Sequence, residues 1–254
     1  MKARRERVDV LLVERGLAPS RARAQALVLA GQVVVGDQRV DKPGAQVPVD
    51  AEVRLKGEVL PYVSRGGLKL KAALDRFGLA VAGEVCADIG ASTGGFTDCL
   101  LQEGATRVHA IDVGRAQLHE KLRQDPRVVS REQVNARSLK DEELPGPVGV
   151  VVIDVSFISL RLVLPSVLPR LREGGLLVAL VKPQFEVGRE RVGKGGVVRD
   201  AEARAEVIHG IRAFVEAEGM TVLGVMDSPV PGPAGNVEAL LAARKGRQGV
   251  VGAT

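Results

Sequence analysis

A glycine-rich loop that starts with an acidic residue follows an apolar run, in Asp88-Ile-Gly-Ala-Ser-Thr-Gly-Gly-Phe-Thr-Asp98. Glycines between a strand and a helix let a ligand approach the backbone at the helix N-terminus. The dinucleotide fingerprint requires Gly-x-Gly-x-x-Gly, whereas this loop has Gly90-x-x-x-Gly94-Gly95. A plain strand–turn–helix corner would explain one or two of these glycines but not the whole set. We therefore expect the loop to bind a ligand that is not a dinucleotide.

Three ionisable residues follow apolar segments further along the chain. Asp154 ends Val-Val-Ile-Asp, Lys182 ends Ala-Leu-Val-Lys, and Glu238 follows a proline-rich loop. Taken singly, each has a simpler explanation, because a charged residue at the end of a strand usually reaches solvent. Together they indicate an active site, because α/β sheets bind ligands at the carboxyl ends of their strands. A buried lysine flanked by carboxylates would be held in place and tuned in its protonation.

Strands that alternate with helices would position these residues. The expected strands are Val85–Ile89, Arg107–Asp112, Val148–Asp154, Leu176–Val181 and Thr221–Met226, and the expected helices are residues 94–104, 115–124, 159–172 and 200–218. Several of these strands are unbroken apolar runs, as is typical of strands that are covered on both faces. The pattern predicts an α/β fold with a Rossmann-like, mostly parallel sheet and helices on both faces.

A smaller module precedes this sheet. Apolar residues at helical spacing end at Gly16, and Ser20 is placed to cap a second helix that ends at Gly31. Short β-type segments follow at Gln32–Val35, Arg39–Val40 and Val47–Leu55. We therefore expect a small α+β domain over residues 1–60, a linker at 61–64, the α/β domain over 65–246, and a frayed tail at 247–254.

Charge and composition exclude several classes of protein. The net charge is +5 over 254 residues, and residues 1–25 hold seven basic against three acidic side chains. This bias favours a nucleic-acid partner for the N-terminal module. Two cysteines and three scattered histidines give no disulfide framework and no metal-ligand spacing. No apolar run reaches the ~18 residues of a membrane span, and the basic N-terminal segment lacks the apolar stretch typical of a signal peptide, so we expect a cytoplasmic protein.

Aromatic residues are scarce, with five Phe, one Tyr and no Trp. This composition argues against recognition of single strands by base stacking. Phe157 and Phe185 are the aromatics nearest in sequence to Asp154 and Lys182. They are therefore the best placed to help present a nucleotide.

The four residues Lys69, Asp154, Lys182 and Glu238 match, in order, the Lys-Asp-Lys-Glu tetrad of FtsJ-like ribose 2′-O-methyltransferases. Three sequence segments resemble the TlyA (haemolysin A) family in particular. They are Tyr-Val-Ser-Arg-Gly-Gly-Leu-Lys-Leu, Asp-Val-Ser-Phe-Ile-Ser and Val-Lys-Pro-Gln-Phe-Glu. The N-terminal module is similar to the RNA-binding domain named after ribosomal protein S-four. The resemblance extends from about Arg7 to Leu241.

The resemblance implies that the cofactor is S-adenosylmethionine and that the reaction needs no metal. The residues that would bind the cofactor are Asp88, Gly90, Ser92, Gly94, Gly95, Phe96, Asp112 and Asp154. Asp112 would accept hydrogen bonds from a ribose. The implied reaction is in-line transfer of a methyl group to a ribose 2′-hydroxyl, with alignment of the two substrates supplying much of the rate. Lys182 would orient the hydroxyl and help to deprotonate it, while Lys69, Asp154 and Glu238 would position it.

The implied partner is ribosomal RNA or a ribosomal subunit, with cytidine as the methylated nucleotide and no obligatory protein partner. The arginines expected to contact RNA phosphates are Arg4, Arg5, Arg7, Arg21 and Arg23. Two other functions are open at this point. The family name suggests a membrane-active cytolysin, although no strongly amphipathic, aromatic-bearing helix supports it. A ribosome assembly factor that binds RNA without catalysis would keep the fold and lose the chemistry.

Overall fold

Two compact units make up the chain, an N-terminal unit of residues 1–60 and a C-terminal unit of residues 61–254. The computed structural model describes residues 5–36, 38–49, 51, 53–55, 61–193, 195–232 and 235–246. Arg4 and the expected tail at 247–254 lie outside the described residues. The segment 61–64, expected to be a linker, lies in the C-terminal unit, where Tyr62 is buried and the backbone N–H of Val63 donates to Asp98.

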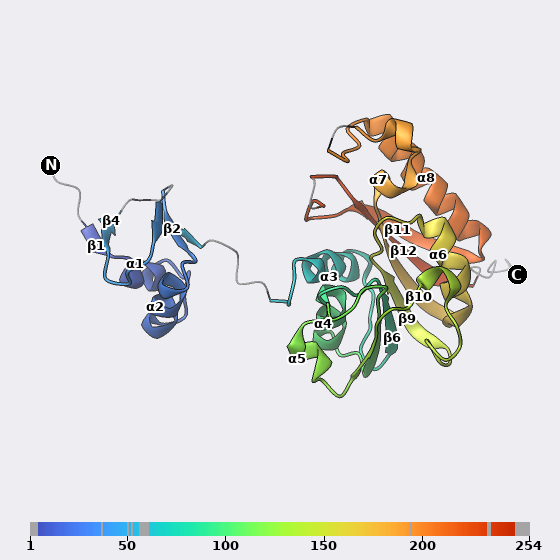
Figure 1. The fold of residues 1–254 in the computed structure, drawn as a ribbon, viewed down its shortest axis with the longest axis horizontal. Helices are drawn as coiled ribbons and strands as arrows, with labels where there is room; N and C mark the ends of the chain where they lie inside the picture. The colour runs from blue at the N-terminus through green and yellow to red at the C-terminus, as the bar shows by residue number, and fades with distance from the viewer. Residues whose placement is uncertain are drawn as a thin grey trace, which may run out of the picture. The chain divides into compact units, whose positions relative to one another are not determined.

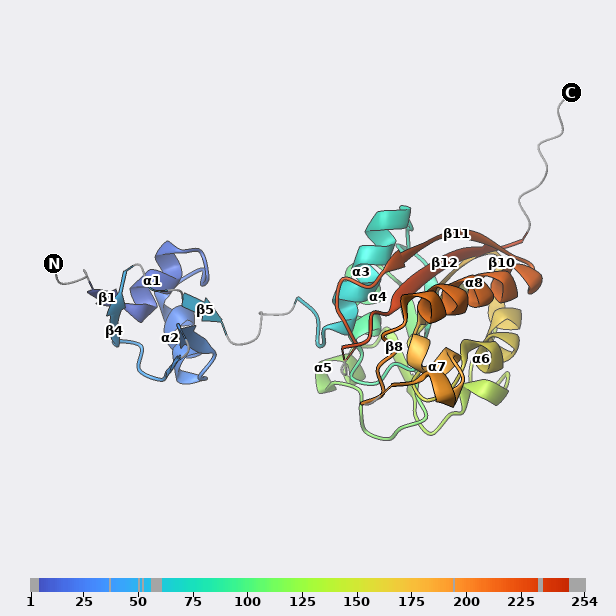
Figure 2. The same ribbon diagram turned by 90° about the horizontal axis from the view of Figure 1, so that it is seen from above.

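The N-terminal unit packs two helices with short strands (Figure 2). Its elements are β1 (Arg5–Arg7), α1 (Val8–Glu14), α2 (Arg21–Leu29), β2 (Val33–Val35), β3 (Gln38–Val40), β4 (Gln46–Pro48) and β5 (Val53–Leu55). Ser20 is the N-cap of α2, because its Oγ accepts a hydrogen bond from the backbone N–H of Arg23. Val8, Leu12 and Val33 belong to one buried cluster that the helices and strands share.

The segment 47–55, expected to be one strand, contributes instead to two sheets. β4 pairs antiparallel with β1, whereas β5 pairs antiparallel with β2 in the sheet β3-β2-β5. β1 was not expected, because its sequence Arg-Glu-Arg has no apolar alternation. Backbone pairing with β4 rather than side-chain pattern therefore defines this strand.

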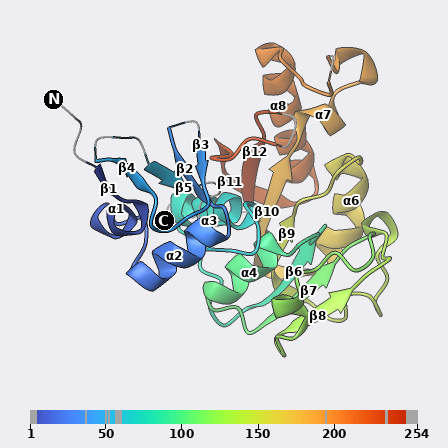
Figure 3. The ribbon, with the colours of Figure 1, turned by 60° about the vertical axis from the view of Figure 1, so that its left-hand side comes forward.

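The C-terminal unit is an α/β domain (Figure 1). Its elements are α3 (Gly66–Phe77), β6 (Val85–Ile89), α4 (Gly95–Gln102), β7 (Arg107–Ile111), α5 (Glu120–Arg123), β8 (Val128–Arg131), β9 (Val148–Ile153), α6 (Leu160–Val167), β10 (Leu171–Val181), α7 (Pro183–Glu186), α8 (Ala201–Ala217), β11 (Met220–Asp227) and β12 (Ala239–Lys245). The strand order is β11-β12-β10-β9-β6-β7-β8, as Figure 3 shows for its central part. The pairs from β8 to β10 are parallel, and β12 is antiparallel to both of its neighbours. The mostly parallel sheet is thereby confirmed.

Both faces of the sheet are covered by helices (Figure 1). Val150 and Val152 of β9 belong to the buried cluster that includes residues of α3 and α4, and Val151 and Ile153 belong to the cluster of α6 and α8. Successive strand residues point to opposite faces, so an unbroken apolar run supplies both cores at once.

Several elements differ from those expected. The helix α3 was not expected, although it is amphipathic and buries Leu70, Ala73 and Leu74. The expected helix 115–124 is reduced to α5, because Ala116 has a positive φ of 53° that a helix cannot contain. The strands β8 and β12 were also missed.

Candidate active site

The glycine loop between β6 and α4 carries the first part of the site. Gly90 and Gly94 have φ angles of 85° and 96°, in the region that favours glycine. A Cβ atom at Gly90 would lie 2.5 Å from the carbonyl oxygen of Asp154, at the end of β9. At Gly95 it would lie 2.2 Å from Oγ of Ser64. The glycines thus allow close backbone packing between neighbouring elements and leave room beside the loop.

Asp88 lies at the C-terminal end of β6 and is fully buried. Its Oδ2 accepts a hydrogen bond from Oγ1 of Thr97 at 2.6 Å. Burial is the main cause that raises the pKa of Asp88 to about 7, and the nearby carboxylates of Asp154 and Asp112 act in the same direction. Its Oδ1 has no hydrogen-bond partner among the described residues. A buried carboxyl of this kind fits a ligand that brings a hydrogen-bond donor or a positive charge.

Asp112 follows β7 and fixes the neighbouring backbone. Its Oδ2 accepts from the N–H of Ser92 and its Oδ1 from the N–H of Gly114, each at 2.7 Å. The carboxylate therefore connects the glycine loop to the segment after the next strand.

Two adjoining cavities meet at this edge of the sheet. The first has a volume of about 270 Å³ and is lined by charged and polar residues, including Arg65, Lys69, Asp88 and Lys182. The second has about 370 Å³ and a more apolar wall. Both cavities share Gly90, Ser92, Asp154 and Ser156 in their walls. A ligand spanning both would therefore pass beside Asp154.

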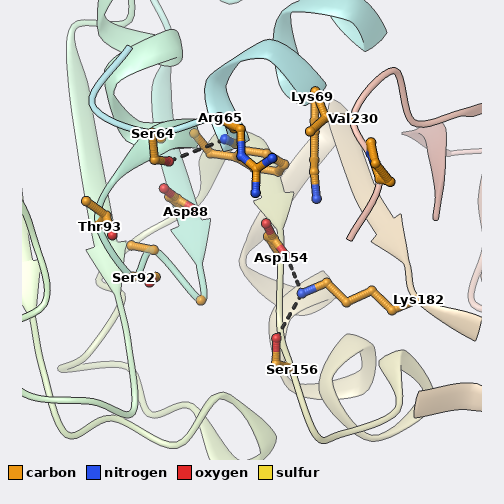
Figure 4. A pocket seen from close by; sticks show the side chains of 16 residues that line it. Ser64, Arg65, Lys69, Asp88, Ser92, Thr93, Asp154, Ser156, Lys182 and Val230 are labelled. Carbon is orange, nitrogen blue, oxygen red and sulfur yellow. Dashed lines mark hydrogen bonds and ion pairs between the residues drawn. The ribbon is translucent and has the colours of Figure 1, made fainter. Parts of the chain in front are cut away.

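Lys182 is held at the end of β10 by two residues that follow β9. Its Nζ lies 2.5 Å from Oδ1 of Asp154 and donates to Oγ of Ser156 at 2.9 Å. The side chain of Lys182 is only 11% exposed, so the amine has little freedom apart from these contacts. Figure 4 shows Asp154, Ser156 and Lys182 around one side of the first cavity, with Lys69 and Arg65 reaching in from α3 and the segment before it.

Lys69 forms the second ion pair of the site. Its Nζ donates to Oε2 of Glu238 at 2.6 Å, and both side chains are at least nine-tenths buried. Glu238 immediately precedes β12. Because β12 is antiparallel to β10, its first residues lie at the edge where the parallel strands end. The structure thus arranges the four matched residues as two ion pairs, Lys182–Asp154 and Lys69–Glu238.

Sequence reasoning missed several residues of the site. Ser156 contacts Lys182, and Arg65 lines the first cavity. Glu186 accepts hydrogen bonds from Oγ of Ser159 and the N–H of Leu160, which joins the segment after Lys182 to the segment after Asp154. All of them lie within the sequence segments that resemble the TlyA family. Their position in those segments was therefore the one sign in the sequence that they belong to the site. Their partners are distant in sequence and could not be assigned.

Two aromatic residues belong to the segments that follow Asp154 and Lys182 in the chain. Phe157 is 90% exposed, lines the second cavity and adopts a positive φ of 64°. Its ring centroid lies 5.0 Å from that of Phe185. The structure therefore brings together the two phenylalanines named from the sequence.

The N-terminal arginines contact other parts of their own unit. Arg5 donates to the carbonyl oxygen of Gln46, while Arg7 and Arg21 both donate to Asp9. Arg23 is exposed in the first turn of α2. Three of these arginines thus have intramolecular contacts that the sequence did not predict.

Within the described part of the chain, no cluster of His, Cys, Asp or Glu could hold a metal ion. No helix among the same residues is long and apolar enough to cross a membrane.

Comparisons with known proteins show the families to which the two units are similar. The sequence model of the FtsJ-like methyltransferase family matches residues 62–245, and that of the S4 domain matches residues 6–53. The chain is 50% identical to YqxC of Bacillus subtilis (strain 168), over 95% of this chain and 86% of that protein. It is 48% identical to the 16S/23S rRNA (cytidine-2′-O)-methyltransferase TlyA of Mycobacterium tuberculosis, over 94% of this chain and 90% of that protein.

A solved structure of a Streptococcus thermophilus protein that carries the name hemolysin is 48% identical, with a TM-score of 0.74. The match covers 96% of this chain and 90% of that one. The order of the two domains, an S4 domain followed by a methyltransferase domain, agrees with the two family matches. The chain therefore belongs to the FtsJ-like methyltransferase family, in the group that includes TlyA and has an S4 domain before the methyltransferase domain.

Proposed function

We propose that this protein transfers a methyl group from S-adenosylmethionine to the 2′-hydroxyl of a cytidine in ribosomal RNA. The observation that carries the proposal is the position of Lys182. Its amine is paired with Asp154 and faces the same cavity as the buried Asp88 and the glycine loop. The relative TlyA, with its named activity on ribosomal RNA, supports the choice of substrate.

The residues of the two cavities fit S-adenosylmethionine. The buried Oδ1 of Asp88 lacks a partner among the described residues, and a Cβ at Gly90 would contact the backbone of Asp154. The residues proposed to hold the cofactor are Asp88, Gly90, Ser92, Gly94, Gly95, Phe96, Asp112 and Asp154. The more apolar second cavity suits an adenine ring, and Asp112 beside it suits ribose hydroxyls. The bound cofactor supplies an electrophilic methyl group on a sulfonium.

Lys182 orients the hydroxyl that receives the methyl group. An ammonium has three N–H donors, of which one is given to Ser156, a second is on the side of the ion pair with Asp154, and a third remains. The third can donate to the ribose 2′-oxygen, which fixes the oxygen for in-line attack. When the amine is neutral it accepts the hydroxyl proton at Nζ, and Asp154 stabilises the ammonium that forms.

Lys69 and Glu238 position the other side of the cavity. Glu238 is 1% exposed and holds the ammonium of Lys69, which itself lines the cavity, in place. A lysine held in this way places a fixed positive charge near the reacting oxygen. The pair therefore stabilises negative charge that develops on the 2′-oxygen.

The N-terminal unit supplies RNA affinity. S4 domains bind RNA, and the basic residues of this unit suit phosphate contacts. We assign the protein to the cytoplasm, where ribosomal RNA is assembled into subunits.

The proposal is tested by mapping ribose methylation on ribosomal RNA from cells with and without the gene. We expect loss of one or a few 2′-O-methylcytidines, restored by the wild-type gene. An unchanged methylation map would overturn the proposal. Leakage of liposomes caused by the purified protein, together with an unchanged map, would favour the cytolysin function instead.

A further inference from the structure

A buried carboxylate at the start of α1 accepts hydrogen bonds from three side chains of the N-terminal unit. Asp9 is fully buried. Arg7 donates to it twice, from Nε to Oδ1 and from Nη2 to Oδ2, both at 2.9 Å. Arg21 Nε and Gln25 Nε2 donate to Oδ2 at 3.1 and 2.9 Å. Asp9 is therefore the common acceptor of two arginines that carry the proposed RNA-binding charge.

Neutralisation of Asp9 does not require both arginines. A buried carboxylate needs a cation and hydrogen bonds, and Arg7 alone supplies a bidentate pair. The hydrogen bond from Arg7 holds the pKa of Asp9 well below its ordinary range, so the group is ionised. With Arg21 added, Asp9, Arg7 and Arg21 together carry an excess of one positive charge, which the carboxylate of Glu6 beside Arg7 offsets in part. This excess is available to an anionic partner.

Both guanidinium groups remain partly accessible while they are held. The side chains of Arg7 and Arg21 are 38% and 56% exposed. Arg21 contacts Asp9 through Nε, so its two terminal amino groups lie outside that contact. Arg7 is confined on its other side, where a Cβ atom at Gly44 would lie 3.3 Å from its Nη1. An arginine already held in one orientation loses less side-chain entropy when it binds a phosphate.

We infer that Asp9 is a positioning residue for RNA binding, which holds Arg7 and Arg21 in the orientation in which they meet phosphates of the RNA backbone. The inference rests on the RNA-binding role proposed above for the N-terminal unit. It assigns to a buried negative charge a favourable effect on the binding of a polyanion.

The direction in which Asp9→Asn changes the affinity for RNA tests this inference. Asp9→Asn and Glu14→Gln each remove one negative charge from α1, and Glu14 is exposed. Charge alone predicts that both variants bind RNA more tightly than the wild type. Positioning predicts that Asp9→Asn binds about tenfold more weakly, while Glu14→Gln binds as tightly or more tightly. Affinity is measured by filter binding of the full chain to unmodified transcripts of bacterial 16S and 23S ribosomal RNA.

A second set of variants separates positioning from a structural role. In an Arg7→Ala/Arg21→Ala background, Asp9→Asn should cause no further loss of affinity, because the residues through which it acts are gone. Gln25→Ala removes an uncharged donor to Asp9 and should change affinity less than twofold, about 0.4 kcal/mol by the ratio of tenfold per 1.4 kcal/mol. Should Asp9→Asn unfold the unit, Arg7→Lys/Arg21→Lys keeps both charges and loses the forked geometry. If Asp9 positions the arginines, this double-lysine variant should bind RNA more weakly than the wild type. If only charge matters, its affinity should be unchanged.

The outcomes distinguish this inference from the proposed function. Wild-type affinity in Arg7→Ala/Arg21→Ala would overturn RNA binding by these two arginines. Weak binding by that variant, combined with wild-type or tighter binding by a folded Asp9→Asn, would overturn only the positioning role. A further loss from Asp9→Asn in the double-alanine background, or unchanged affinity in the double-lysine variant, would also overturn it.

Discussion

Nζ of Lys69 lies 2.6 Å from Oε2 of Glu238, although the two residues are 169 positions apart in the chain. The contact joins α3, near the start of the methyltransferase unit, to the residue before β12, near its end. Both side chains are removed from water, so each depends on the other for compensation of its charge. This ion pair therefore joins the first helix of the domain to its last strand at the candidate site.

Removal of both partners of this pair should cost less than the sum of the two single removals. Glu238→Gln leaves the ammonium of Lys69 without its carboxylate, and we expect a loss of about 3 kcal/mol in the free energy of unfolding. Lys69→Met should cost a similar amount. The double variant Lys69→Met/Glu238→Gln should be at least about 1 kcal/mol more stable than the sum of the two effects predicts. Urea denaturation of all four proteins measures the coupling, and additive losses would contradict it.

Gly90 should tolerate a methyl group much less well than a glycine of similar φ elsewhere. Gly90→Ala places a Cβ 2.5 Å from the carbonyl oxygen of Asp154, whereas Gly146, with a φ of 72°, has no atom within 4 Å of such a Cβ. We expect Gly146→Ala to lose about 1 kcal/mol from backbone strain alone. Gly90→Ala should lose about 3 kcal/mol and most of its affinity for S-adenosylmethionine. Denaturation measures the stability of both variants, and calorimetry measures their affinity for S-adenosylmethionine. Equal effects of Gly90→Ala and Gly146→Ala would refute the close packing of the glycine loop against β9.

Asp88 should make stability fall as the pH rises. Burial raises its pKa to about 7 in the folded protein, against about 4 for an unfolded chain. Between these values the folded state binds a proton that the unfolded state has lost, so the contribution is lost as pH rises through the folded pKa. The wild type should lose about 2 kcal/mol relative to Asp88→Asn between pH 5 and pH 8. The free energy of unfolding of both proteins is measured against pH without cofactor. Parallel curves would contradict a raised pKa of Asp88 in the folded protein.

Glu186 should support turnover without contacting either substrate. Its carboxylate accepts from Oγ of Ser159 at 2.6 Å and from the N–H of Leu160 at 2.8 Å. Glu186→Ala should lower kcat about tenfold, because Lys182 and Asp154 lose their mutual alignment, and change cofactor affinity less than about threefold. Glu186→Gln retains an acceptor oxygen and should recover most of kcat. Glu190→Ala, at an exposed carboxylate nearby, is the control, and a wild-type kcat in Glu186→Ala would contradict the role.

The sequence pattern predicted the centre of the sheet better than its edges. β6, β7 and β9 follow their expected bounds closely, because strands buried on both faces are largely apolar, and β9 is apolar throughout. β12 was missed because its sequence Ala-Leu-Leu-Ala-Ala-Arg-Lys is also compatible with a helix. Its identity as a strand depends on pairing with β10 and β11. Tertiary pairing of this kind has no local signature.

The pairing of charges could not be predicted either. The sequence placed Lys69, Asp154, Lys182 and Glu238 at one site, but not which lysine meets which carboxylate. It also assigned Arg7 and Arg21 to RNA without reference to Asp9, whose burial depends on the packing of α1. A charge pattern gives the sign of a surface, whereas the fold decides which of those charges are already engaged.

Lys182 is proposed to act on the ribose hydroxyl and not in cofactor binding. The most direct test measures single-turnover methyl transfer to ribosomal RNA and the Kd for S-adenosylmethionine in the same preparation of Lys182→Ala. We expect methyl transfer to fall by about a thousandfold or more, with Kd within about threefold of the wild type. Methyl transfer within about tenfold of the wild-type rate would contradict the assignment of Lys182.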